Sequence, residues 1–294
     1  MNRRGPLPAA GALCAAFALA LGLTACGAGD DADGDGFLPA GEQARTLALP
    51  FDEHTLSPFE MRTLRHAEDL LVRDCMRAHG MDWDVLPAPD EDTTDPPHRR
   101  RYGVIEARVA ERHGYGPAPR SADEALLQEI REGRESLPAT EYRAAHGDEG
   151  GAGCLQEAQE DLMAGVPDMD ENLLNSYIHT AFEASKSDPA VVDAFADWSA
   201  CMAERGLDHP TPAEAEDDPR WADREGDPSA AEIEVATADV ACKDAASVVE
   251  VWRDAEAAAQ DGLIEEHTAD FAHFARVKEE RTERARAVIE RSAP

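Results

Sequence analysis

The sequence predicts an all-α fold: a helical domain of two weakly repeated, disulfide-stapled halves with a long C-terminal helix. Three observations predict this class. Apolar residues recur at spacings of three or four, no clear strand-like alternation appears, and an eight-residue motif occurs twice, beginning at Cys75 and at Cys201. The 294 residues suffice for one large domain or two small ones.

The N-terminal segment has the features of an export signal. Two arginines, at positions 3 and 4, precede an apolar run over about residues 7–23, which is too short for a stable membrane span. The run ends in Leu-Thr-Ala-Cys, which resembles the lipobox of bacterial lipoproteins. The resemblance implies cleavage before Cys26 and lipidation of its thiol. A buried helix is the alternative, but this run has no polar face. We expect residues 1–25 to be a signal peptide and the rest to be anchored by its lipid.

The segment DADGDGFLPAGE, residues 31–42, fits the calcium-binding loop of an EF-hand. Its context is poor, because cleavage before Cys26 leaves no room for a preceding helix and no second loop is present to pair with. We expect residues 26–44 to be an acidic Gly/Asp tether, and a weak calcium site is the alternative. The calcium ligands of that site would be Asp31, Asp33, Asp35, Phe37 and Glu42.

A helical extracytoplasmic domain is expected over residues 45–294. Ser57 suits the N-cap of its first long helix, Pro58 suits the first helical position, and Glu60 completes a capping box. The pairs Asp188-Pro189 and Asp227-Pro228 begin two later helices in the same way.

The pattern of the C-terminal region predicts continuous helix. After Pro228, the residues up to Ser292 contain no proline and a single glycine, Gly262, and their apolar residues keep a spacing of three or four. We expect one very long helix, or two helices joined near Gly262. The segment ENLLNSYIHTAFEAS, residues 171–185, predicts a further helix.

The repeated motif reads CMRAHGMD from Cys75 and CMAERGLD from Cys201. Each copy follows an amphipathic helix, and its glycine stands where a helix ends. A long proline- and acid-rich loop follows each copy, and each half then reaches a helix with one more cysteine. The halves cover about residues 45–165 and 170–294.

Six cysteines are present, of which Cys14 is expected to leave with the signal peptide and Cys26 to carry the lipid. The remaining four allow three pairings, and the repeat favours one of them. The simplest pairing gives one bridge to each half, Cys75–Cys154 and Cys201–Cys242. An even number of cysteines in an exported chain is typical of disulfides, and no CxxC spacing indicates zinc.

The charge restricts the class of partner. The chain has 28 Lys+Arg against 61 Asp+Glu, a formal net charge of −33. Repulsion of polyanions argues against nucleic acid and anionic wall polymers, whereas cations and cationic protein segments remain compatible. The charge also keeps an exported protein in solution.

One basic cluster interrupts the acidic chain. HRRRYG, residues 98–103, and ERHGYG, residues 111–116, flank a short helix. They form either a partner-binding loop or, as we prefer, a set of internal ion pairs. The histidines are scattered: His179 and Glu183 share a helix face, whereas His267 and His273 do not. The four tryptophans are expected to pack the core or to clamp the loops.

The chain resembles the uncharacterised secreted lipoproteins of actinobacteria. Four segments carry the resemblance: LVRDCMRAHGMDW, RRRYGV, DWSACMAERGLDHP and EVATADVACKDAASVVEVW. The resemblance implies a location and a helical build but no catalytic role.

These observations favour a non-enzymatic binding or accessory module, lipid-anchored on the extracytoplasmic face of the cell membrane. Its partners would be the membrane, through the lipid, and an envelope protein, with no nucleic acid. The alternative is an envelope hydrolase or metal-dependent enzyme with a site of Asp, Glu and His that the sequence does not reveal. No HExxH, GxSxG, P-loop or dinucleotide motif occurs, and no cofactor is predicted beyond calcium.

Overall fold

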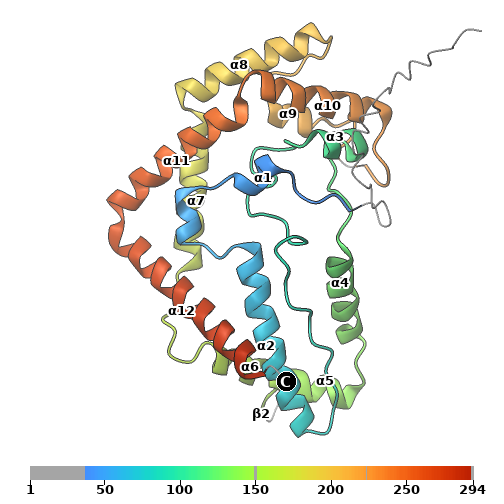
Figure 1. The fold of residues 1–294 in the computed structure, drawn as a ribbon, viewed down its shortest axis with the longest axis vertical. Coiled ribbons are helices and arrows are strands. Elements are labelled where there is room, and N and C mark those ends of the chain that lie inside the picture. The colour runs from blue at the N-terminus through green and yellow to red at the C-terminus, as the bar shows by residue number, and fades with distance from the viewer. Residues whose placement is uncertain (1–36, 149–150, 223, 293–294) are drawn as a thin grey trace, which may run out of the picture. The chain divides into compact units, whose positions relative to one another are not determined.

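A computed structural model describes residues 37–148, 151–222 and 224–292, all within one compact unit (Figure 1). The predicted signal peptide, Cys26 and the loop residues Asp31, Asp33 and Asp35 lie outside the described residues. The described chain is mostly helical, so the predicted all-α class is confirmed. None of its helices combines the length and apolar composition that crossing a membrane requires.

The described part contains twelve α-helices, one 3-10 helix and one short hairpin. In chain order they are α1 (Glu42–Thr46), η1 (Pro50–Glu53), α2 (Pro58–Ala78), α3 (Ala107–His113), α4 (Ala122–Glu135), α5 (Ala139–His146), β1 (Gly147–Asp148), β2 (Gly151–Ala152), α6 (Cys154–Leu162), α7 (Glu171–Lys186), α8 (Pro189–Glu204), α9 (Pro212–Glu216), α10 (Ala230–Ala245), α11 (Val248–Glu266) and α12 (Thr268–Ser292). Strands β1 and β2 pair antiparallel, with Gly147 opposite Ala152.

The helix starts follow local chemistry. The Ser57 hydroxyl accepts a hydrogen bond from the Glu60 amide, and the Glu60 carboxylate accepts one from the Ser57 amide, which completes the predicted capping box. Asp188 caps α8 before Pro189, also as predicted. The third expected start is two residues late: Ser229, and not Asp227, caps α10.

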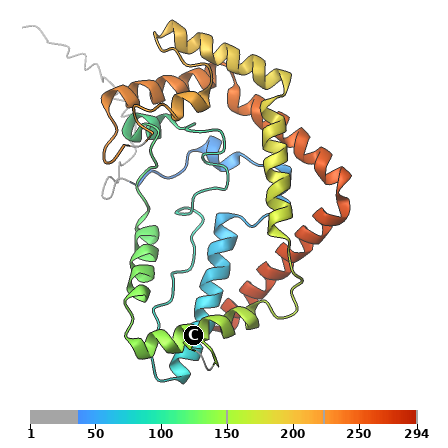
Figure 2. The same cartoon turned by 180° about the vertical axis from the view of Figure 1, so that it is seen from behind.

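The two halves of the sequence are interleaved. Helix α12, from the second half, lies beside α2 and also contacts α6, both from the first half (Figures 1 and 2). Helix α3, from the first half, packs on α10 from the second. Neither half therefore builds its core from its own residues alone.

The largest apolar cluster joins α3, α8, α10 and α11. Trp198, which is fully buried, lies in it and donates a 2.9 Å hydrogen bond to Asp239. Leu38, Ala40 and Ala44 are buried in the same cluster. The chain is thus packed from Leu38 onward, whereas the sequence predicted a tether as far as residue 44.

The two copies of the repeated motif end their helices identically. Gly80 and Gly206 adopt positive φ angles of 75° and 79°. The next amide in each copy donates a 3.0 Å hydrogen bond to the carbonyl of a buried methionine, from Met81 to Met76 and from Leu207 to Met202. This is the Schellman arrangement, in which a glycine at positive φ closes the helix.

The disulfides are Cys75–Cys154 and Cys201–Cys242, the pairing that the repeat predicts. In both, the Cα atoms are 5.7 Å apart, within the usual range of about 4.4–6.8 Å. The first disulfide joins α2 to the start of α6, and the second joins α8 to α10.

The C-terminal region is divided into three helices. Ser247, in the left-handed region with φ 51°, separates α10 from α11, and His267 separates α11 from α12. The helices predicted to join near Gly262 join five residues later, at His267, and the exposed Gly262 lies inside α11. The turn at Ser247 directs α11 toward α7 and α8.

Candidate functional site

The predicted basic cluster is neutralised inside the molecule. His98 contacts Asp52 at 2.7 Å, Arg99 pairs with Asp95 and Glu106, Arg100 pairs with Glu216, and Arg101 pairs with Glu256. The interpretation as internal ion pairs is therefore confirmed. These contacts join the loop to η1, α9 and α11.

A different surface leaves its arginines unpaired. Helix α4 lies beside the extended segment that connects α2 to α3 (Figures 1 and 2). Two contacts hold it there: Thr93 donates a 2.9 Å hydrogen bond to Asp123 at one end of α4, and Arg134 pairs with Asp69 at the other. Three adjoining hollows, of about 290, 380 and 630 Å³, lie along α4. Together we call them the arginine groove.

The first hollow carries most of the positive charge. The residues that line it are Pro58, Met61, Arg62, Arg65, Thr94, Asp95, Arg120, Glu124, Leu127, Gln128 and Arg131. Arg65 and Arg131 also line the second hollow, and Arg134 lines the second and third. The arginines come from α2, from the loop before α4 and from α4 itself, so the positive charge surrounds the hollow.

Arg65, Arg120 and Arg131 are exposed. No ion pair or hydrogen bond joins their guanidinium groups to the residues that the structure describes. In a chain with 61 acids and 28 bases, an arginine meets a carboxylate readily, as the paired loop of residues 98–103 illustrates. Three unpaired guanidiniums around one hollow are therefore a distinctive feature of this surface.

Arg62 sits against the same hollow. Its Nη1 donates a 2.9 Å hydrogen bond to the hydroxyl of Thr94. Its Nε and Nη2 are buried and have no acceptor among the described residues. A buried charged donor without an acceptor is costly, so an anion bound in the groove would stabilise this side chain.

Apolar side chains continue the groove past the arginines. Leu126 is 43 % exposed on α4, and Trp83 is buried beneath the Arg134 guanidinium, which lies 4.3 Å from the centre of the indole ring. The third hollow is lined by Asp82, Trp83, Asp84, Val85, Leu126, Glu129, Ile130, Gly133, Arg134, Leu137 and Glu141. The groove thus offers apolar contacts next to its charges.

The acids near the second hollow belong to the packed side of α2. Burial, followed by repulsion from the Asp69 carboxylate, raises the pKa of Glu68. Asp69 is itself held by the Leu86 amide at 2.7 Å and by Arg134. This carboxylate fixes the loop in place, and the charge of Arg65 acts on the neighbouring Glu68 in the opposite direction, lowering its pKa.

The predicted calcium ligands are only partly described. Phe37 lines a small hollow with Arg99 and Ile105, and Glu42 is exposed at the start of the five-residue helix α1. The other ligands, Asp31, Asp33 and Asp35, lie outside the described residues. The calcium loop stays a prediction.

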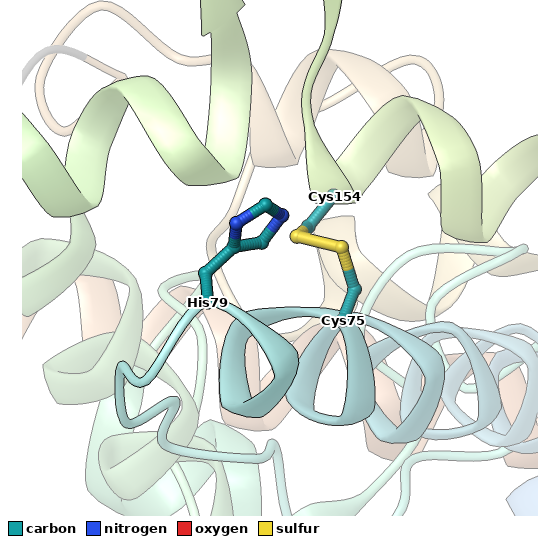
Figure 3. A group of neighbouring side chains, drawn as sticks. All are labelled: Cys75, His79 and Cys154. Carbon is teal, nitrogen blue, oxygen red and sulfur yellow. A yellow bond between two sulfur atoms is a disulfide. The ribbon is translucent and has the colours of Figure 1, made fainter.

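A cluster of metal-binding residue types surrounds the first disulfide (Figure 3). The sulfurs of Cys75 and Cys154 and a ring nitrogen of His79 lie within 4.8 Å of one another. Figure 3 shows the imidazole of His79 beside the disulfide. A carboxylate oxygen of Glu157 lies 3.6 Å from the Cys75 sulfur. While the sulfurs are bonded to each other, this cluster is a disulfide with a histidine and a glutamate next to it.

The remaining histidine and tryptophan predictions have structural outcomes. Glu183 pairs with Lys186 at 2.6 Å, and not with the exposed His179. His267 stacks near the ring of Tyr177, and His273 contacts the carbonyl of Asp168. All four tryptophans are buried, as expected: Trp83, Trp198, Trp221 and Trp252.

The sequence analysis missed the arginine groove. Its lining residues come from segments about 60 positions apart, and α4 itself was not predicted. One local signal is present, since Arg62 and Arg65 are three residues apart on a helix and therefore share a face.

The chain was also compared with known proteins. No family model, no curated protein and no solved structure matched it. The resemblance to secreted lipoproteins of actinobacteria therefore stays a prediction, and the groove is interpreted from its own chemistry.

Proposed function

We propose that this protein is a non-enzymatic binding module, lipid-anchored through Cys26 on the extracytoplasmic face of the cell membrane, and that the arginine groove binds an acidic segment of an envelope protein. The observation that carries the proposal is the set of unpaired arginines, Arg65, Arg120 and Arg131, around one hollow of a very acidic chain. Their guanidiniums are suited to carboxylates, which they bind through two parallel hydrogen bonds.

The lining of the groove favours a peptide over other anions. A peptide can place carboxylates against Arg65 and Arg131 and apolar side chains against Leu126. Helix α4 has 14 residues, or about 21 Å, which matches about six residues of an extended peptide. The net charge of −33 repels long polyanions and anionic lipid surfaces, whereas a short peptide with a few carboxylates interacts mainly with the arginines within the screening length of about 8 Å.

The lipobox and the disulfides support the location. Disulfides persist in oxidising compartments outside the cytoplasm, and the described chain has two. Replacement of Cys26 by alanine should release the protein from the membrane fraction or leave it unprocessed. Unchanged attachment after membrane fractionation would contradict the anchor.

A binding experiment tests the groove. The probe is a fluorescent peptide of alternating glutamate and leucine, titrated into the full chain. We expect salt-sensitive binding that the double variant Arg65→Glu/Arg131→Glu weakens by about tenfold or more, because each charged hydrogen bond contributes about 1.5–3 kcal/mol.

The matched control is Arg77→Glu/Arg205→Glu, which makes the same change of net charge at two exposed helix-terminal arginines outside the groove. It should bind the peptide within about twofold of the native protein, because screening weakens distant charges. An equal loss in both variants would mean that only net charge matters. Inorganic phosphate or anionic vesicles that displace the peptide at equal charge concentration would also refute a peptide ligand.

A further inference from the structure

The first disulfide has neighbours that the second one lacks. His79 is four residues after Cys75, at the end of α2, and Glu157 is three residues after Cys154, in the first turn of α6. The repeat places Arg205 where His79 would be in the second half, and Ala245 where Glu157 would be. The two disulfides therefore share a backbone setting and differ in the side chains around them.

We propose that Cys75, Cys154, His79 and Glu157 form a redox-gated site for a thiophilic divalent metal ion such as Zn²⁺. The disulfide closes the site, and its reduction opens it. This inference does not depend on the arginine groove or its ligand.

The ligand set fits zinc. Zn²⁺ binds thiolate, imidazole and carboxylate in a tetrahedron, with bonds of about 2.0–2.3 Å and ligand atoms about 3.3–3.8 Å apart. Both sulfurs and the His79 nitrogen already lie within 4.8 Å of one another, and Glu157 reaches to 3.6 Å from one sulfur. Rotation of exposed or half-buried side chains is sufficient to close the tetrahedron, because only Cys154 is fully buried.

The opening step balances with a dithiol as reductant. The dithiol transfers two electrons and two protons to the Cys75–Cys154 disulfide and becomes a cyclic disulfide. The sulfur–sulfur bond breaks and two thiols form. Binding of Zn²⁺ then releases the two thiol protons to solvent, since the thiolate is the ligand.

The side chains around the first disulfide favour metal binding there. The Cys75 side chain is half-buried and His79 is exposed, so a dithiol and a hydrated metal ion can approach from solvent. Burial is alike at the second disulfide, where Cys201 is half-buried and Cys242 is fully buried. The difference is that Arg205 stands there at the position of His79, and its positive charge opposes a cation. The second half therefore supplies a control inside the same molecule.

The test titrates Co²⁺ into the full chain after reduction with a phosphine, a reductant that spares the metal. Thiolate-bound Co²⁺ gives a near-ultraviolet charge-transfer band. We expect one ion for each chain. His79→Ala removes a direct ligand and should weaken Co²⁺ binding by at least about 10- to 100-fold, because loss of a mere outer-shell partner of a metal ligand already weakens binding by that factor. The matched variant Arg205→Ala should bind as the native protein does.

A second measurement distinguishes folded from unfolded thiols. The reduced chain is alkylated with and without Zn²⁺, and the four cysteines are followed by peptide mass spectrometry. Zinc should protect Cys75 and Cys154 and leave Cys201 and Cys242 unprotected. Equal protection of both pairs, protection that survives His79→Ala, or no protection at all would overturn the proposal.

Discussion

The phenol of Tyr102 donates a 3.0 Å hydrogen bond to the carboxylate of Glu256, a side chain that is fully buried in α11. Arg101 pairs with the same carboxylate, and Gln260 donates a 2.9 Å hydrogen bond to it. Gln260 in turn accepts a 2.8 Å hydrogen bond from the Phe51 amide. One buried charge thus connects the basic loop, α11 and η1.

Removal of that carboxylate should be strongly destabilising. Glu256→Ala leaves Arg101, Tyr102 and Gln260 without their shared acceptor, so we expect the free energy of unfolding to fall by about 3–5 kcal/mol. Glu256→Gln retains an acceptor of similar shape and should cost less. Urea unfolding measures both, and an alanine variant within about 1 kcal/mol of the native protein would refute this role.

The two helix-ending glycines should respond alike. Gly80→Ala and Gly206→Ala each place a Cβ at a positive φ angle with open space around it, so the cost is conformational and amounts to about 1–2 kcal/mol. Thermal unfolding of the two variants should give equal losses. A neutral effect at one position alone would show that the two copies of the motif are not equivalent in solution.

The disulfides should stabilise one shared transition. Their cysteines are 79 and 41 residues apart, so chain entropy predicts about 4 kcal/mol from each. The repeat alone suggests that Cys201→Ser loosens the C-terminal half separately. The interleaved packing predicts instead a single cooperative transition that shifts as a whole, in both Cys75→Ser and Cys201→Ser. Two resolved transitions by calorimetry would contradict the packing.

Acid should destabilise the protein through His54. Burial lowers the pKa of His54 below its ordinary value of 6.5, and its Nδ1 lies 3.0 Å from the Phe271 carbonyl. At a pH between the lowered pKa of the folded state and the ordinary pKa of about 6.5, His54 binds a proton in the unfolded chain but not in the folded one. The stability that neutral His54 contributes is therefore complete above about pH 6.5 and is lost as the pH falls toward the folded pKa. Other titrating groups also contribute to the pH dependence of the free energy of unfolding, so the effect of His54 is measured as a difference between variants.

Urea unfolding from about pH 7.5 to about pH 5 checks this. The variant His54→Gln should lose less stability over this interval than the native protein loses. His179→Gln, at an exposed position, should retain the native slope. An identical slope in all three proteins would show that His54 does not titrate with folding.

Local chemistry accounts for what the sequence predicted well. The starts of α2 and α8 are determined by short local signals, Ser57 with Pro58 and Asp188 with Pro189. No tertiary information is needed to predict them. The disulfide pairing follows from the repeat, because two equal helix ends set two equal geometries.

Tertiary packing decided what the sequence did not predict. A glycine is the stronger helix breaker in isolation, yet α11 continues through Gly262, and the chain turns at Ser247, where the buried Val248 and Val249 begin α11. The arginine groove has no local pattern either, because Arg62 and Arg131 meet only after α4 is placed. Leu38 is buried although its neighbours in sequence are mostly polar or small.

The interleaving of α2 with α12 also determines the order of events after synthesis. The part of the apolar face of α2 formed by Ala67 and Leu70 is covered by residues more than 200 positions later, among them Ala285 and Val288 of α12. Synthesis proceeds from the N-terminus, so α2 leaves the ribosome long before α12. Folding to the native state therefore waits for the last helix to arrive, and a chain interrupted before α12 leaves an exposed apolar face for chaperones and proteases to recognise.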